Sequence, residues 1–320
     1  LVLNGWARGA VFLDADATWN PGSATRASLH RDLHNDGVSV VVLQHDVLPV
    51  ERPEWFHPTL PGRFADHLKA TVQHADLVIC NSAATRDRLT SLARAQAPGW
   101  DTPTTVVPLA GSGAPSPDRD RAAGPSTSRS RAPMLLVVGT LEPRKNHALA
   151  IDVWERLTPD HPDVELVLVG HRGWHDGELV ARVEQLRTTT SGVTWRSDVD
   201  DDELDDLYRA ATCVLVPSLD EGYGLPVVEA LARGAVVLSS DAGALREVGG
   251  DAVQRLPPND VGAWVDAVSR HLDDDEHHQE ARRRSAAQPP RTWADVTADV
   301  AAALWRLKGS APAERGDVEE

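Results

Sequence analysis

Short apolar runs alternate with amphipathic stretches along most of the chain, and this alternation predicts an α/β protein. Residues 10–13, 38–43 and 77–80 form nearly continuous apolar runs, which are typical of parallel strands buried on both faces. A helical pattern over residues 24–36 separates the first two runs. The same alternation resumes at residue 133, so we expect two doubly wound, Rossmann-like domains that face across a cleft, with ligand at the carboxyl ends of their strands.

A change in composition marks the boundary between these domains. Residues 111–132 are rich in Gly, Pro, Ser and charge, as expected of a linker. We therefore predict an N-terminal domain over 1–110 and a second domain over 133–288. Apolar positions with helical spacing predict a closing helix within 289–308, and the acidic end, 309–320, is expected to be a disordered tail.

The most informative motif follows the apolar run 213–216 and reads P-S-L-D-E-G-Y-G-L-P-V-V-E. Its glycines allow tight backbone turns, and helical spacing begins at Leu225. The first N–H groups of such a helix, together with its dipole, attract phosphate or sugar oxygens. Glu221 in the loop and Glu229 inside the helix are spaced to accept hydrogen bonds from two sets of hydroxyls. A helix with an acidic first turn explains the same residues equally well.

A second motif, residues 135–147, reads L-L-V-V-G-T-L-E-P-R-K-N-H and predicts a strand, a polar loop and a helix. Arg144 and Lys145 are expected where this helix begins, although the helix dipole disfavours cations there. Because this pair of cations contradicts the preference of the helix dipole, it is a candidate for a functional site. A guanidinium fork and a lysine point charge suit a diphosphate. A solvated loop that carries two basic residues is the alternative.

Together the two motifs resemble those of a known family. Gly139-Thr-Leu-Glu-Pro-Arg-Lys-Asn146 followed by Glu221-x(7)-Glu229 is similar to the donor-binding half of retaining glycosyltransferases of family 4, the group 1 glycosyl transferases, which have the GT-B fold. The similarity extends over most of the chain. It implies that Arg144 and Lys145 hold the diphosphate of a nucleoside diphosphate sugar in place of a metal, with no cofactor. It also implies that Glu221 contacts the transferred sugar and Glu229 the ribose.

The resemblance extends the expected site beyond these four residues. The loop at residues 196–199 packs against the nucleotide base in the family. In the family's H-D-x-x-P stretch, here from His45 to Pro49, the histidine faces the donor sugar, although a lone histidine has many structural uses. The expected catalytic residues are His45, Arg144, Lys145 and Glu221. The expected donor-binding residues are Gly139, Thr140, Arg144, Lys145, Ser197, Val199, Glu221, Gly222, Tyr223, Gly224, Leu225 and Glu229.

Three other segments have simpler explanations beside the functional one. Asn81 and Ser82 follow a strand end, where N-capping of a helix is the preferred interpretation. Trp19 and Trp55 would suit stacking on a sugar or lipid acceptor, and buried packing explains them as well. Residues 170–174 resemble the family's G-x-x-G-W turn near the donor, and a polar turn is the alternative.

Charge and cysteine content narrow the class of protein. The formal net charge of −16 argues against nonspecific binding of nucleic acid. Cys80 and Cys213 both lie in apolar runs, which favours buried thiols in a reducing compartment over a disulfide or a metal pair. No apolar run has the length of a membrane span. These features indicate a cytoplasmic protein. If its acceptor is linked to a lipid, we expect the protein to contact the membrane peripherally.

The chain departs from the family at its beginning, because the usual first strand and Gly-rich turn are absent. We therefore expect an incomplete N-terminal domain. Donor binding is accordingly better supported by the sequence than catalytic turnover. The resemblance implies transfer of a mannose-like or glucose-like hexose to a hydroxyl of a glycan or lipid-linked acceptor. A noncatalytic nucleotide-sugar-binding fragment and a nonhydrolysing sugar epimerase are the alternatives.

Overall fold

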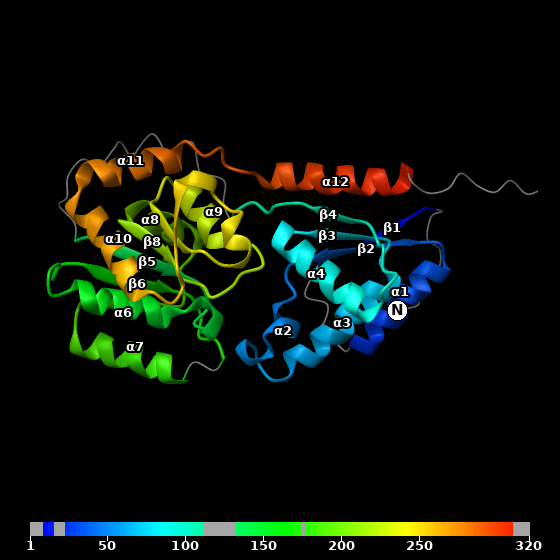
Figure 1. The fold of residues 1–320 in the computed structure, drawn as a ribbon, viewed down its shortest axis with the longest axis horizontal. Helices are drawn as coiled ribbons and strands as arrows, with labels where there is room; N and C mark the ends of the chain where they lie inside the picture. The colour runs from blue at the N-terminus through cyan, green and yellow to red at the C-terminus, as the bar shows by residue number, and fades with distance from the viewer. Residues whose placement is uncertain (1–8, 16–22, 112–131, 175–176, 310–320) are drawn as a thin grey trace, which may run out of the picture. The chain divides into compact units, whose positions relative to one another are not determined.

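The chain divides into two compact units that do not follow the order of the sequence. The computed structural model describes residues 9–15, 23–111, 132–174 and 177–309. Unit 1 comprises Leu1–Glu51, Thr59–Pro108 and Trp293–Glu320, and unit 2 comprises Arg52–Pro58 and Leu109–Thr292 (Figure 1). The segment Arg52–Pro58 therefore belongs to the same unit as residues 109–292, although its neighbours in the sequence belong to unit 1.

Unit 2 contains a fully parallel six-stranded sheet. Its strands are β5 (Met134–Val138), β6 (Glu165–Val169), β7 (Val193–Arg196), β8 (Cys213–Val216), β9 (Val237–Ser240) and β10 (Val253–Leu256). They lie in the order β10-β9-β8-β5-β6-β7. The chain runs outward from β5 to β7 and then returns to β8 on the other side of β5. This reversal is the topological switch point of a doubly wound sheet, where ligands bind at the carboxyl ends of the strands.

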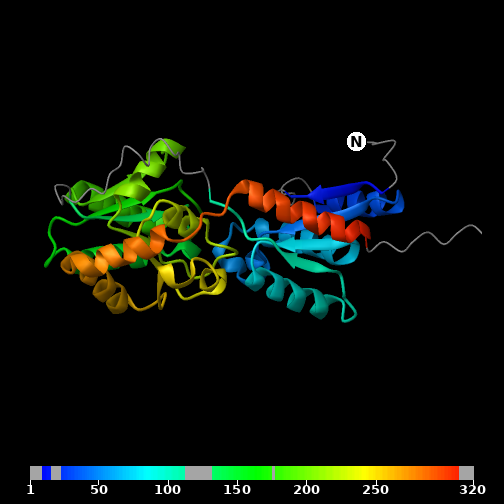
Figure 2. The same ribbon diagram turned by 90° about the horizontal axis from the view of Figure 1, so that it is seen from above.

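Helices cover both faces of this sheet, as its apolar strands require (Figure 2). One core contains residues of α6 (His147–Leu157), α7 (Gly177–Thr189), α10 (Val261–Asp273) and α11 (Asp275–Ala286). The other contains residues of α8 (Asp201–Ala210) and α9 (Leu225–Ala232). Alternate residues of β5 enter the two cores, since Leu135 and Val137 belong to the first and Met134 and Leu136 to the second. Short 3₁₀ turns complete the unit: η1 (Pro53–Trp55), η2 (Pro143–Lys145), η3 (Gly243–Arg246) and η4 (Gly250–Ala252).

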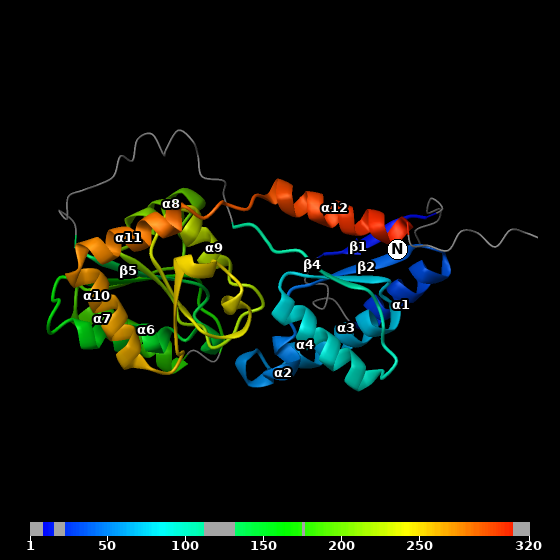
Figure 3. The ribbon, with the colours of Figure 1, turned by 45° about the horizontal axis from the view of Figure 1, so that its top comes forward.

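Unit 1 is built on a parallel sheet of four described strands. These are β1 (Val11–Asp14), β2 (Ser39–Gln44), β3 (Leu77–Cys80) and β4 (Thr104–Val106), and they lie in sequence order. The helices are α1 (Ser23–Asn35), α2 (Leu48–Glu51), α3 (Leu60–His74), α4 (Ala83–Gln96) and α12 (Trp293–Gly309). In Figure 3, α12 runs along the side of the sheet opposite α1 and α3.

The element predictions agree with the structure where apolar runs are continuous. The strands at 77–80 and 213–216 have the predicted bounds, and β2 lies one residue later than the predicted 38–43. The closing helix forms as α12 and belongs to unit 1. Positions 112–131 of the expected linker, Trp19, and positions 310–320 of the expected tail lie outside the described residues.

Both cysteines are free and fully buried, as the sequence predicts. Burial raises the pKa of each thiol to about 12, which makes thiolate chemistry unfavourable near neutral pH. Among the described residues, no helix combines the length and the apolar character that a membrane crossing requires.

Candidate functional site

Two loops meet on either side of the switch point in unit 2. One follows β5 and contains residues 139–146, and the other follows β8 and contains residues 217–224. The N–H of Leu219 donates to the carbonyl of Arg144 at 2.7 Å, and the Asn146 side chain donates to the carbonyl of Pro217 at 3.1 Å. Asn146 has a φ of 54°, a left-handed conformation that asparagine tolerates better than most residues. These bonds hold the two predicted motifs against one another.

The first loop also packs closely on the turn that follows β6. Gly139 and Gly170 both have a φ of 151°, where side chains are disfavoured. A Cβ on Gly170 would lie 2.1 Å from the Gly139 carbonyl oxygen, so no other residue fits without moving the loop. The N–H of Gly173 donates to the Leu141 carbonyl at 3.0 Å. The G-x-x-G-W turn at residues 170–174 therefore supports the loop at residues 139–146, which carries the two basic residues.

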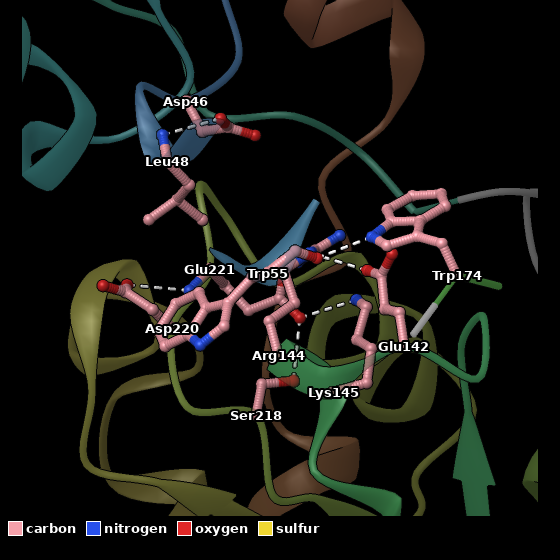
Figure 4. A network of polar contacts seen from close by, with 10 residues as sticks. All are labelled: Asp46, Leu48, Trp55, Glu142, Arg144, Lys145, Trp174, Ser218, Asp220 and Glu221. Carbon is pink, nitrogen blue, oxygen red and sulfur yellow. Dashed lines mark hydrogen bonds and ion pairs between the residues drawn. The ribbon is translucent and has the colours of Figure 1, made fainter. Parts of the chain in front are cut away.

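Four charged side chains gather where the two loops meet (Figure 4). Arg144 Nη1 lies 2.5 Å from Glu221 Oε2, and Lys145 Nζ lies 2.6 Å from Glu221 Oε1. On its other side, Arg144 Nε lies 2.6 Å from Glu142 Oε1. Ser218 donates its hydroxyl to Glu221 Oε1 at 2.8 Å. The group combines two carboxylates with two cations, and all four side chains are largely buried.

The position of the two cations differs slightly from the prediction. The sequence predicts Arg144 and Lys145 where the helix begins. In the structure they lie in the 3₁₀ turn η2, and α6 begins two residues later, at His147. Burial, and to a smaller extent the charge of Lys145, lowers the pKa of His147 to about 4, so this imidazole is neutral at pH 7. The basic pair therefore lies before the first residue of α6.

The charges around Glu221 keep its carboxyl ionised. Burial alone would raise the pKa of this group, but Lys145 and then Arg144 outweigh burial and hold the pKa at about 2. An ionised carboxylate accepts hydrogen bonds and donates none. Glu221 can thus bind the hydroxyls of a sugar or orient the two cations, but it cannot serve as a general acid near neutral pH.

The second glutamate of the motif is held by a buried tyrosine. Glu229 lies in α9, is 8% exposed, and accepts a hydrogen bond from the Tyr208 hydroxyl at 2.9 Å. Burial raises the pKa of Tyr208 well above its usual value, and the charge of Glu229 raises it further, so the phenol stays protonated and remains a donor. Arg233 donates to the Glu229 carbonyl at 3.1 Å. The hydrogen bond from Tyr208 fixes the direction of the Glu229 carboxylate.

The remaining predicted donor residues surround these two glutamates in unit 2. Gly224 caps α9 with a φ of 112°, and a Cβ there would lie 2.6 Å from Leu245. Gly222 is buried, whereas Leu225 is 38% exposed. Tyr223 is half-buried and donates its hydroxyl to the Leu109 carbonyl at 2.9 Å. The half-buried Thr140 follows Gly139 in the first loop.

The predicted base-binding loop lies at a different strand end. It follows β7, which is two strands from β5 in the sheet. Ser197 is exposed, and the half-buried Val199 packs against the second core of the unit. The structure thus places both residues at the carboxyl edge of the same sheet as Glu221 and Glu229.

His45 lies apart from this set, because it belongs to unit 1. It follows β2 and is half-buried, and its carbonyl accepts a hydrogen bond from Thr85 at 3.3 Å. Its expected contact with a donor sugar stays a prediction. In the same unit, Ser82 caps α4 by accepting from the N–H of Thr85 at 3.0 Å, which confirms the capping interpretation.

Trp55 participates in packing within unit 2. Its carbonyl accepts a hydrogen bond from Trp174 Nε1 at 2.6 Å, and the rings of Phe56 and Trp174 stack with centroids 6.2 Å apart. Arg52 lies over the Trp55 ring, 4.9 Å from its centroid. The structure therefore supports the packing interpretation for the segment Arg52–Pro58.

Sequence reasoning gave no role to three residues of this site. Glu142 lies within the first motif and Ser218 within the second, but the fold is needed to show which charged groups they contact. Tyr208 lies in α8, 21 positions before Glu229. The only sequence signal for Tyr208 is an aromatic residue with a polar group in a helix whose other inward positions are leucines. Among the described residues, no cluster of three His, Cys, Asp or Glu side chains has the geometry of a metal site.

Comparison with known proteins places this site in a family. The model of "Glycosyl transferases group 1" matches residues 118–288, which is more than half of the chain. The serotype-specific mannosyltransferase WbdA of Escherichia coli is 28% identical over 221 residues, which are 66% of this chain and 27% of WbdA. O-antigen chain mannosyltransferase B of the same species is 40% identical over 139 residues, or 43% of this chain and 35% of that protein. The chain thus matches roughly a third or less of the length of these relatives.

Solved structures share the fold over nearly the whole chain. HepE from Anabaena, crystallised with UDP, superposes with a TM-score of 0.68 at 18% identity and covers 93% of this chain and 79% of its own. Sucrose-phosphate synthase from Thermosynechococcus elongatus superposes with a TM-score of 0.67 at 21% identity. The superposition covers 94% of this chain and 74% of the synthase. These likenesses confirm the predicted GT-B fold.

Proposed function

The chain belongs to the group 1 glycosyl transferases, and we propose that it transfers a hexose from a nucleoside diphosphate sugar to a hydroxyl of a glycan or lipid-linked acceptor. The observation that carries this proposal is the convergence of Arg144, Lys145 and Glu221 at the switch point of unit 2. Two buried cations at the carboxyl ends of parallel strands suit a diphosphate, and the adjacent ionised carboxylate suits the hydroxyls of the attached sugar.

The same geometry supports a distribution of roles. Arg144 and Lys145 bind the diphosphate and stabilise the charge that grows on it as the bond to the sugar breaks. Glu221 accepts hydrogen bonds from the sugar, and Glu229, fixed by Tyr208, accepts them from the ribose. Gly139, Thr140 and the backbone of residues 222–225 border the diphosphate, and Ser197 with Val199 borders the base. Neither a metal nor a cofactor takes part in the proposed reaction.

The proposed reaction retains the configuration of the sugar. The bond between the anomeric carbon and the diphosphate breaks, and the acceptor oxygen forms its bond to that carbon on the same face. The proton of the acceptor hydroxyl passes to the departing phosphate oxygen, so charge and atoms balance without a protein base. This route agrees with a Glu221 that is ionised and already paired with two cations.

The relatives suggest the class of substrate. WbdA and O-antigen chain mannosyltransferase B are mannosyltransferases by name, which supports a mannose-like hexose and a role in polysaccharide biosynthesis. HepE was also crystallised with UDP and glucose, which supports a glucose-like donor as the second choice. The two free buried thiols support placing the reaction in the cytoplasm.

The test is product analysis with a defined donor. The purified chain is incubated with GDP-mannose or UDP-glucose and with mannose- or glucose-terminated oligosaccharides, and the product linkage is determined by nuclear magnetic resonance. We expect an oligosaccharide extended by one hexose with the anomeric configuration of the donor. An inverted linkage would contradict the proposed route. Binding without transfer would instead support a nucleotide-sugar-binding fragment, and interconversion of the donor without an acceptor would support an epimerase.

A further inference from the structure

Arg144 lies between two buried carboxylates, and only one of them belongs to the predicted site. Glu221 is 2.5 Å from the Nη1 atom of Arg144, and Glu142 is 2.6 Å from the Nε atom. The Glu142 side chain is 3% exposed, which makes it the more buried of the two. A carboxylate so deeply buried beside a substrate-binding arginine affects how firmly that arginine is held.

The two carboxylates differ in how readily they take up a proton. Lys145 and Arg144 both pair with Glu221 and outweigh its burial, so the pKa of Glu221 is about 2. For Glu142 the balance is the opposite. Burial raises its pKa, Arg144 and Lys145 only partly compensate, and the negative charge of Glu221 raises it further. Of the two carboxylates, Glu142 is therefore the one that takes up a proton more readily.

Binding of a donor changes the charge balance of the cluster. Glu142 and Glu221 carry two negative charges, and Arg144 and Lys145 carry two positive charges, so the four groups sum to zero. The diphosphate of a nucleotide sugar adds two negative charges without adding a cation. Uncompensated charge in a buried site is costly, and the usual response is a change of protonation. The turn after β6 adds one further cation, Arg172, but its side chain is exposed.

We propose that Glu142 takes up a proton from solvent when the donor diphosphate binds, and that this proton frees Arg144 to pair with the phosphate. The inference rests on the proposed function, because it requires the diphosphate to bind at Arg144 and Lys145. The neutral carboxyl group remains beside Arg144 Nε and so keeps the guanidinium in its orientation. Glu142 is thus a positioning residue whose charge is linked to donor binding.

Calorimetry measures this proton directly. GDP-mannose and UDP-glucose are titrated into the protein near neutral pH, in buffers that have different enthalpies of ionisation. These sugars are suitable probes because their phosphates are esterified and fully ionised, whereas a terminal phosphate titrates at about pH 6 and would obscure the result. We expect a binding enthalpy that depends on the buffer with the sign of proton uptake. We also expect the affinity to fall as pH rises, by at most about tenfold per pH unit for one proton.

Two variants identify the group that takes up the proton. Glu142→Gln should bind the donor without proton uptake and with an affinity nearly independent of pH. Glu165→Gln, which alters an exposed carboxylate of β6, is the matched control and should behave like the wild type. Circular dichroism shows whether each variant is folded. If Glu142→Gln does not fold, Glu142→Asp keeps the carboxylate and should still take up a proton, over a different pH range.

The outcomes separate this inference from the proposed function. Donor binding with an enthalpy that is the same in every buffer overturns the proton uptake and leaves the donor site intact. Uptake that persists in Glu142→Gln assigns the proton to another group and also overturns the inference. Failure of both nucleotide sugars to bind removes the donor site itself, and the inference with it.

Discussion

Lys145 Nζ lies 2.6 Å from Glu221 Oε1, although 76 positions separate the two residues in the sequence. The pair joins the loop after β5 to the loop after β8 and buries a cation and a carboxylate together. Removal of Glu221 leaves Lys145 without this buried partner, whereas removal of Lys145 leaves Glu221 still paired with Arg144. The lysine and the glutamate can therefore be tested separately.

Replacing Lys145 with alanine should abolish most of the transfer. We expect Lys145→Ala to lower kcat by a factor of tens or more while the protein stays folded, since the lysine is proposed to stabilise the departing diphosphate. Steady-state kinetics and circular dichroism measure both effects. Lys308→Ala removes an exposed lysine of α12 and is the control. Unchanged transfer by Lys145→Ala would remove the lysine from its proposed role.

The pairing of Glu221 should make stability depend on acid pH. Its folded-state pKa of about 2 lies below the ordinary value of 4.5, so its contribution to stability is complete above pH 4.5 and is lost as pH falls toward 2. At neutral pH the shift corresponds to a contribution on the order of 3 kcal/mol. We expect Glu221→Gln to be less stable than the wild type near pH 7, and the difference to shrink as pH is lowered. Urea unfolding at several pH values tests this, and a difference that stays constant with pH would contradict it.

Tyr208 should matter for donor affinity through Glu229. Tyr208→Phe removes the hydroxyl that lies 2.9 Å from the Glu229 carboxylate. A hydrogen bond to a charged group contributes about 1.5–3 kcal/mol, so we expect the KM for the donor to rise roughly tenfold or more with little change in kcat. A double-mutant cycle with Glu229→Gln supplies the control. Additive effects in that cycle would show that Tyr208 does not act through Glu229.

The close contact between Gly170 and Gly139 gives a prediction about backbone geometry. Gly170→Ala places a Cβ 2.1 Å from the Gly139 carbonyl oxygen at a φ of 151°, so the basic loop must move. We expect a loss of about 1–3 kcal/mol in the free energy of unfolding and a clear loss of donor affinity. Gly177→Ala is the matched control, because a Cβ there meets no atom within 4 Å. Equal behaviour of the two variants would show that the loop contact has no role in binding.

The sequence predicts most of the second unit because its strands are continuous apolar runs. Residues 213–216 form a strand with the predicted bounds, and Gly224 and Leu225 begin a helix as their pattern indicates. The order of the motifs along the chain is also sufficient to place both loops at strand ends. Local patterns thus determine which element carries each candidate residue.

Contacts between distant segments are not predictable in this way. Nothing in the local pattern shows that Arg144 is paired with Glu221, or that Tyr208 reaches Glu229. The segment Arg52–Pro58, which belongs to unit 2, likewise contacts the distant Trp174 through the carbonyl of Trp55. Such contacts arise from the packing of the whole unit, because they join residues that lie far apart in the sequence.

The measurement that tests the donor site most directly is calorimetric titration of the chain with UDP-, GDP- and ADP-sugars, repeated on Glu229→Ala. The account predicts saturable binding of one nucleotide sugar and weaker binding by the variant, because Glu229 is proposed to contact the ribose. Absence of binding by all three, or equal affinity in the variant, would contradict the proposed site.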